Sequence, residues 1–131
     1  SPPMNFIKGP IIKKEGKYYF NEGRFVVRIV DSMTKAIEPY LDETVIFGIR
    51  PEDIYDKLFV SEAPPDNTIK ATCEVIEPMG SEAYLFLNTG KNPLVAKVGG
   101  HNKPTLNQDM DLVLDMSKVH FFDKDTEKTI G

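Results

Sequence analysis

The chain has 131 residues, of which 40% are hydrophobic and 27% are charged, and its formal net charge is −4 at pH 7. This length and composition predict one globular domain, 1–131, that buries its own core. The excess of acidic residues argues against nucleic acid as a partner, because phosphate binding requires a basic surface. The single cysteine, Cys73, excludes an internal disulfide and any site built from several thiolates.

The chain shows no apolar run near the roughly 20 residues that span a bilayer, and no signal peptide opens it. We therefore expect a cytoplasmic protein. The opening Ser1-Pro2-Pro3 is typical of a linker interior, so we expect this chain to be part of a longer protein.

Alternating polar and apolar residues in the first half predict short β-strands at 17–20, 25–29 and 44–49. Between the last two, Asp31 or Ser32 can cap a helix of one or two turns. Pro39 disfavours helical geometry at Glu38, so we expect the helix to end there.

The stretch FGIRPEDIYD, residues 47–56, combines a strand end with a glycine, a proline and four charges. Gly48 has no side chain, so another backbone or a partner can approach it closely. Arg50 is held extended by Pro51 and is expected to pair with a nearby carboxylate. Pro51 suits a first helical position and Glu52 favours a helix N-terminus, so we predict a short helix at 51–55.

A polar, proline-bearing segment at 61–68 predicts a loop, so that loop 61–66 joins two β-rich halves, 1–60 and 67–131. The second half has strand candidates at 69–77, 83–88, 94–98, 111–114 and 119–122. In the first of these, Ile69, Ala71, Cys73 and Val75 are predicted to share the buried face. Many short strands with one or two short helices predict a mainly β fold of the barrel or sandwich kind.

No catalytic motif is complete. Gly9…Gly16-Lys17-Tyr18 has the wrong glycine spacing for a phosphate-binding loop, and tyrosine replaces the hydroxyl residue. His101 and His120 lack metal-ligand spacing, and Cys73 lies on an apolar strand face. The carboxylate pairs 52/53, 109/111 and 123/125 are interpreted as solvated charges, since neighbours in sequence need not face one cleft. We expect no catalytic residue, no metal site and no cofactor site in this chain.

Four ordered segments carry a family resemblance: SPPMNF at residues 1–6, GIRPED at 48–53, VIEPMGSE at 75–82 and MSKVHFFD at 116–123. With them the chain resembles, over essentially its whole length, the C-terminal regulatory domain of the ATP-binding subunit of ABC-type sugar importers. The resemblance implies an OB-type β-barrel, the transport-associated OB (TOBE) fold. It also implies an upstream nucleotide-binding domain, which would hold the ATP and magnesium.

In that family the regulatory domains pair across a two-fold axis and keep two ATPase subunits together, and in maltose-type members a sugar-phosphotransferase component inhibits transport through the same domain. The resemblance therefore implies a homodimer, membrane-spanning importer subunits as partners of the parent protein, and a place at the inner face of the cell membrane. The transported sugar does not follow from this domain.

Site residues follow from the resemblance position by position. Gly48 and Glu77 match the inhibitor-contacting or interface surface of the maltose-type subunit, and Arg50 and Glu52 are expected to hold that surface in shape. The interface candidates are Gly80, Ser81, Glu82, Phe122 and Asp123. Asp42 and Ala71 stand where the maltose-type subunit has glycines, which argues against phosphotransferase regulation here.

Two other binding functions stay open. A small-ligand or oxyanion-binding module would need donors converging in a groove, for which the 91–92 and 99–100 loops are the candidates. A single-stranded nucleic-acid OB-fold would use exposed aromatic residues, but the acidic excess argues against it.

Overall fold

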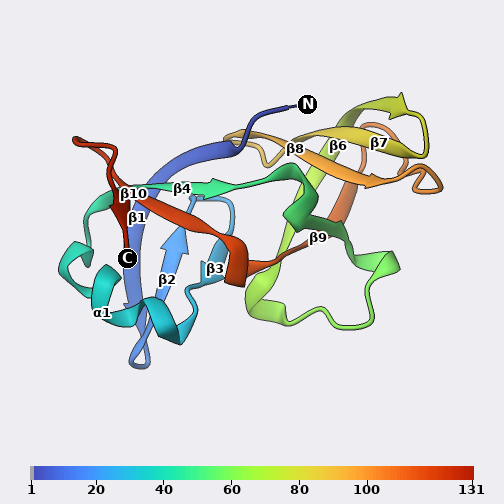
Figure 1. The fold of residues 1–131 in the computed structure, drawn as a ribbon. Coiled ribbons are helices and arrows are strands. Elements are labelled where there is room, and N and C mark those ends of the chain that lie inside the picture. Colours follow the sequence, from blue (N-terminus) through green and yellow to red (C-terminus); the bar gives the residue numbers. More distant parts are fainter. Residues whose placement is uncertain (1) are drawn as a thin grey trace.

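Two antiparallel β-sheets make up most of the structure, a computed structural model that describes residues 2–131 (Figure 1). The strands are β1 (Asn5–Lys14), β2 (Lys17–Asn21), β3 (Val26–Arg28), β4 (Thr44–Ile49), β5 (Ile54–Asp56), β6 (Thr68–Met79), β7 (Glu82–Asn88), β8 (Pro93–Gly99), β9 (Asp109–Leu114), β10 (His120–Asp123) and β11 (Thr129–Ile130). One α-helix, α1 (Thr34–Ile37), lies between the 3-10 turns η1 (Asp31–Met33) and η2 (Glu38–Tyr40). Further 3-10 turns are η3 (Pro51–Asp53), η4 (Lys57–Phe59), η5 (Pro65–Asn67) and η6 (Met116–Lys118).

The strand order is β11-β10-β4-β1-β2-β3 in one sheet and β5-β9-β6-β7-β8 in the other. In the second sheet the outer strands β5 and β8 also lie against each other, so the sheet curls into a nearly closed barrel. The two β-rich halves expected from the sequence exchange strands. β5 of the first half pairs with β9, and β10 of the second half pairs with β4. The mainly β, OB-type barrel fold predicted above is confirmed.

The longest strand of the first half, β1, was missed in the sequence because Gly9-Pro10 interrupts it with two residues that disfavour strands. Gly9 is needed where it is: a Cβ there would strike the backbone carbonyl of Asn21 and the Phe20 ring. The missing side chain lets the end of β2, the strand that pairs with β1, lie close to Gly9.

A short helix after Asp31 is confirmed as η1 and α1, but neither Asp31 nor Ser32 caps it through its side chain. Its predicted end at Glu38 is wrong, because Glu38 keeps helical dihedral angles and η2 continues through Pro39 to Tyr40.

The helix predicted at 51–55 is wrong beyond its first turn. Residues Pro51–Asp53 form η3, and Ile54–Asp56 then continue as strand β5. These residues are extended because they pair with β9, with Ile54 opposite Leu114 and Asp56 opposite Leu112. The side chains of Ile54 and Asp56 are buried, and that of Tyr55 faces out.

Strand β6 contains a β-bulge between Cys73 and Val75 that changes which side chains face the core. Ile69, Ala71 and Cys73 are buried as predicted, but Val75 is 53% exposed. The extra residue Glu74 shifts the alternation by one position, so the prediction for Val75 was wrong. We call the β6–β7 hairpin beyond the bulge the arm: its β6 side is mostly exposed, whereas Ala83, Tyr84 and Leu85 on its β7 side are buried.

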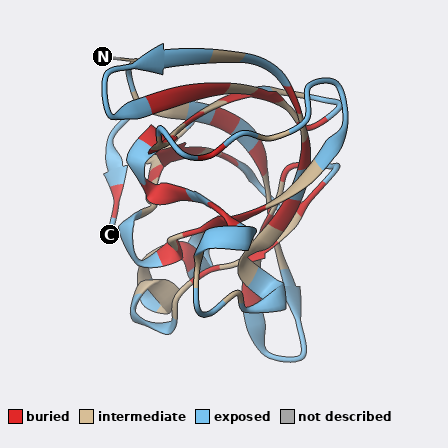
Figure 2. Cartoon of the chain, turned by 90° about the vertical axis from the view of Figure 1, so that its right-hand side faces the viewer, coloured by how far each residue is buried: buried red, intermediate tan, exposed pale blue. Residues whose placement is uncertain are grey.

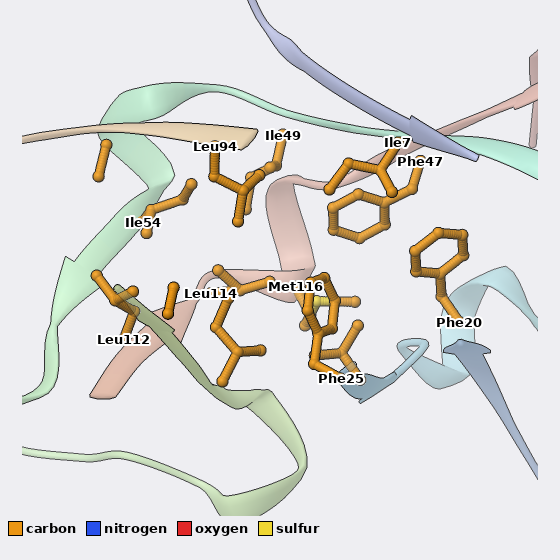
Figure 3. Packing of buried hydrophobic residues seen from close by; sticks show 14 of the residues in the cluster. Ile7, Phe20, Phe25, Phe47, Ile49, Ile54, Leu94, Leu112, Leu114 and Met116 are labelled. Atoms are coloured by element: carbon orange, nitrogen blue, oxygen red, sulfur yellow. The ribbon is translucent and has the colours of Figure 1, made fainter. Parts of the chain in front are cut away.

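The two sheets share one hydrophobic core. Figure 2 shows buried residues along the strands and exposed residues at the turns. In Figure 3, Ile7, Phe20 and Phe47 of the first sheet meet the apolar side chains of the second. Contributions from the second sheet and from the turn after it are Ile54, Leu94, Leu112, Leu114 and Met116.

Two polar side chains fasten the sheets together. Asn5 Nδ2 donates to the carbonyls of Ile49 and Val95, and Asn5 Oδ1 accepts from the Val95 amide at 2.8 Å. Glu22 is fully buried at the turn between β2 and β3 and accepts from Thr89 Oγ1 and Asn92 Nδ2 in the turn between β7 and β8. Each residue therefore joins elements that are about 70 or more positions apart in the chain.

Candidate functional site

Two of the predicted residues, Gly48 and Phe122, come together on the outer face of β1, β4 and β10. The strand register places Phe6, Gly48 and His120 in one row across these strands, and Lys8, Ile46 and Phe122 in the next. We call the surface formed by Phe6, Lys8, Ile46, Gly48 and Phe122 the aromatic face.

Gly48 does not leave room for a partner backbone, contrary to the expectation from the sequence. A Cβ at Gly48 would lie 2.7 Å from Met4 Sδ and 3.0 Å from Phe122 Cε2, so the chain's own side chains fill the space above it. The absent side chain instead allows the rings of Phe6 and Phe122 to approach edge to face, with centroids 5.9 Å apart. The face therefore presents these rings, and not the glycine backbone, to solvent.

The aromatic face is apolar and hollowed. Phe6 is 61% exposed, and a hollow of about 380 Å³ is lined by Phe6, Ile46 and Phe122 with Lys8 and Glu127 at its sides. Phe6 and Ile46 were missed as site residues. Strand alternation could have found Phe6, since Ile7 is buried beside it, but β1 itself was not predicted.

Arg50 lies at the end of this face, where its Nη1 is 3.3 Å from His120 Nε2. The predicted ion pair with a carboxylate is wrong: within residues 2–131, no carboxylate lies within salt-bridge distance of Arg50. The neighbouring acid Asp53 turns inward and is 4% exposed, with Lys118 Nζ at 4.0 Å. Burial raises the pKa of Asp53, and the positive charge of Lys118 only partly offsets this.

The Asp123 carboxylate forms hydrogen bonds within its own turn and with Tyr40. Its carboxylate accepts from the backbone amides of Thr126 and Asp125 and from Tyr40 Oη. These hydrogen bonds, led by that of Thr126, lower the pKa of Asp123. The hydrogen bond that the Tyr40 hydroxyl donates to Asp123 raises the pKa of Tyr40. Asp123 thus holds the β10–β11 turn in shape beside Phe122.

The other candidates lie on the arm formed by β6 and β7. Glu77, Gly80, Ser81 and Glu82 are all exposed near its tip, together with Met79, which is 48% exposed. This arm and the aromatic face are separate places on the molecule, so the structure does not unite the predicted site residues.

Glu52 and Glu82 nevertheless line the same hollow, which lies between η3, β5 and β8. There Lys97 Nζ lies 3.4 Å from Glu82 Oε1. Nothing in the sequence indicated that the two glutamates line one hollow, since they belong to different halves.

The loops suggested for oxyanion binding use their polar groups internally. Asn92 Nδ2 donates to Glu22, and the Asn92 amide donates to Thr89 Oγ1. The Gly100 amide donates to the Ser81 carbonyl. These donors do not converge on an open groove.

Within residues 2–131, no helix has the length and apolar character needed to cross a membrane.

Comparison with known proteins places the chain in a family. The model of the MalK OB-fold domain matches residues 1–54, and that of the TOBE domain matches residues 63–121.

The chain is similar to three curated proteins over 99% of its own length. It is 35% identical to the trehalose/maltose import ATP-binding protein MalK of Thermococcus litoralis, and 35% identical to the multiple sugar-binding transport ATP-binding protein MsmK of Streptococcus mutans. It is 33% identical to the oligosaccharides import ATP-binding protein MsmX of Bacillus subtilis. The matches cover 35%, 34% and 35% of these relatives, so the chain spans about a third of their length.

Among solved structures, the cytoplasmic molybdate-binding protein ModG, with molybdate bound, superposes with a TM-score of 0.64. The match covers 89% of this chain and 94% of that one at 13% identity, which supports a shared fold. The two family models and the sugar-import relatives agree with each other and with the two-sheet barrel. The chain therefore belongs to the family of MalK-type OB-fold and TOBE domains found in ATP-binding subunits of ABC sugar importers.

Proposed function

We propose that this chain is the non-catalytic regulatory and dimerisation domain of the ATP-hydrolysing subunit of an ABC sugar importer. It would hold two such subunits together and offer a surface to regulatory partners. The names of the relatives, all import ATP-binding proteins, support the transport setting. This chain corresponds to about a third of each relative, and ATP and magnesium would bind in the remaining part of the parent protein. That parent would work with membrane-spanning importer subunits at the inner face of the membrane.

The observation that carries the pairing role is the aromatic face. Monomeric proteins rarely leave a large contiguous apolar surface in water, and aromatic residues are enriched where proteins associate. Phe6 is 61% exposed and borders an apolar hollow of about 380 Å³, and the Phe122 ring packs against it. A second copy, related by a two-fold axis, would cover the Phe6 rings of both chains at once.

Pairing through this domain would serve transport by keeping two catalytic units close together. When ATP-binding units separate during a transport cycle, a lasting contact elsewhere makes their return intramolecular. A modest affinity between regulatory domains is enough for this purpose.

The arm of β6 and β7 is the proposed surface for a regulatory partner. Its exposed Val75, Glu77 and Met79 stand away from the aromatic face, so a partner could bind there without separating the pair. A sugar-phosphotransferase component is one such partner, although Asp42 and Ala71 depart from the maltose-type pattern.

Sedimentation equilibrium over a wide range of chain concentrations tests the pairing. We expect a reversible dimer that Phe6→Glu weakens at least tenfold, because a charge would be buried in an apolar contact. Leu106→Glu is the matched control, since Leu106 is also exposed, at 47%, but lies outside the aromatic face. A chain that stays monomeric throughout, or a Phe6→Glu variant that pairs like the control, would contradict the proposal.

A further inference from the structure

Two opposite charges border the hollow of the aromatic face. Lys8 lies on β1 and Glu127 lies in the turn between β10 and β11, and both residues line this hollow. Both are exposed. Within residues 2–131, neither Lys8 nor Glu127 forms an ion pair, so both charges remain free to contact a partner.

Strand β4 separates the two charges. In the sheet, β1 lies on one side of β4 and β10 lies on the other. Lys8, Ile46 and Phe122 form one row across these three strands, and the turn that carries Glu127 follows directly after β10. The face therefore has a positive side at β1, an apolar middle over β4 and a negative side at β10.

The other charges of this turn do not alter that pattern. Lys124 pairs with Asp125 at 3.2 Å, so these two offset each other. Lys124, Asp125 and Lys128 do not line the hollow, whereas Glu127 does.

Symmetry limits how two such faces can pack on each other. For the faces of two copies to point at each other, the two-fold axis must lie in the plane of contact. If the axis runs along β4, the β1 side of one copy meets the β10 side of the other. If the axis runs across the strands, β1 meets β1, and each charge approaches its own kind. Opposite charges across an interface favour an orientation, and like charges oppose it.

We propose that Lys8 and Glu127 determine the orientation of the pair. The axis runs along β4, and Lys8 of each copy lies beside Glu127 of the partner subunit. By symmetry this ion pair forms twice, once on each side of the apolar middle formed by Ile46 and Phe122. The inference rests on the pairing proposed above, and it adds which residues select the partner and its orientation.

The same axis gives Arg50 a role in the contact. Phe6 and His120 occupy the β1 and β10 positions of one row, so Phe6 of one copy lies over His120 of the partner subunit. Arg50 lies 3.3 Å from His120 and has no carboxylate partner within the described residues. Because aromatic faces attract cations within about 6 Å, Arg50 of one copy is attracted to the Phe6 ring of the other.

Charge-reversal variants test the orientation. Lys8→Glu and Glu127→Lys should each weaken self-association about five- to tenfold, because each change turns two attractions into two repulsions. Mixed together, the two variants should form a heterodimer about as tight as the wild-type dimer. In that heterodimer the new glutamate faces the new lysine, and the native Lys8 faces the native Glu127.

The measurement is an NMR titration of ¹⁵N-labelled Lys8→Glu with unlabelled Glu127→Lys. The matched control is Lys103→Glu titrated with Glu74→Lys, since these residues are also exposed, lie outside the aromatic face and give the same changes of net charge. Both control variants should self-associate as the wild type does, and their mixture should show no preference for the heterodimer. The preference in the test mixture should decline as salt rises.

A wild type that pairs through the aromatic face, with a test mixture that behaves like the control mixture, would overturn this inference and leave the proposed pairing intact. Tighter pairing of Lys8→Gln than of the wild type would also overturn it, because like charges would then meet at the contact. A wild type that stays monomeric would contradict the proposed pairing itself, and this inference with it.

Discussion

Glu22 and Asp53 are both buried carboxylates, yet their environments act on stability in opposite directions. Burial by itself raises the pKa of Glu22, but hydrogen bonds from Thr89, Asn92 and two backbone amides outweigh it, and the pKa lies below its ordinary value of 4.5. Asp53 has no comparable set of donors, and burial raises its pKa above the ordinary value of 3.8. The ionised form is therefore favoured by folding at Glu22 and disfavoured at Asp53.

Glu22→Gln should lower the free energy of unfolding by about 2–3 kcal/mol at pH 7, because the new amide group faces donors where a carboxylate oxygen accepted. Urea denaturation measures this. Since the folded-state pKa of Glu22 is lowered, its contribution is present above pH 4.5 and is lost as the pH falls through the folded-state pKa. The wild type should therefore lose its advantage over the variant on acidification. An unchanged difference down to acid pH would disprove this role of the ionised carboxylate.

Asp53→Asn should leave stability at pH 7 unchanged or raise it by up to about 1 kcal/mol, since the charge is buried with only a distant cation, Lys118 at 4.0 Å. With a raised pKa, the stability associated with this acid is greatest at low pH and declines as the pH rises through the folded-state pKa. The gain of the variant should accordingly disappear at low pH. A loss of several kcal/mol at pH 7 would show that the Lys118 pair dominates.

Gly9 and Gly48 both lie where other parts of the chain approach the glycine closely, but the approaching groups differ. An alanine methyl at Gly9 would strike the Asn21 backbone carbonyl, which cannot move without disturbing β2, so we expect a loss of about 2–3 kcal/mol. At Gly48 the obstacles are the Met4 and Phe122 side chains on an exposed face, so the loss should be about 1 kcal/mol or less. Thermal unfolding of both variants measures the difference, and equal losses would contradict this explanation.

At the scale of elements, alternation predicted most strands because one face of each sheet packs on the shared core. Alternation failed as a predictor where contact with a neighbouring strand determines the backbone conformation. Gly9-Pro10 resembles a strand interruption, but the end of β2 lies close to Gly9 and requires the glycine. Residues 54–56 resemble a helix, but they pair with β9. The bulge at Glu74 likewise depends on the register with β7, which no local pattern contains.

Asn5, the first residue of β1, joins this strand to other elements through its side-chain hydrogen bonds. Asn5→Ala should lower the free energy of unfolding by about 1–2 kcal/mol, because its three hydrogen bonds join β1 to Ile49 and Val95. Hydrogen exchange of the Val95 amide should accelerate more than that of its neighbours. Gln108→Ala, an exposed change in a loop, is the control. Unchanged exchange at Val95 would mean that the bridge does not form in solution.

At the scale of the whole molecule, the sequence predicted the fold through ordered motifs but only part of the surfaces. Gly48 and Phe122 were chosen separately and proved to be neighbours across β4 and β10. Phe6 and Ile46 complete the aromatic face, and they are recognised from the strand register and from the hollow that they line. The hollow that Glu52 and Glu82 line was not predicted, because η3 and β8 are brought together only by closure of the barrel.

The central claim, that the aromatic face pairs two copies of this domain, is tested most directly by an NMR dilution series on the ¹⁵N-labelled chain. We predict concentration-dependent shifts that share one dissociation constant and centre on Phe6, Ile46, Gly48 and Phe122. These shifts should be absent in Phe6→Glu and retained in Leu106→Glu. Spectra that do not change with concentration, or changes centred on another surface, would contradict the account.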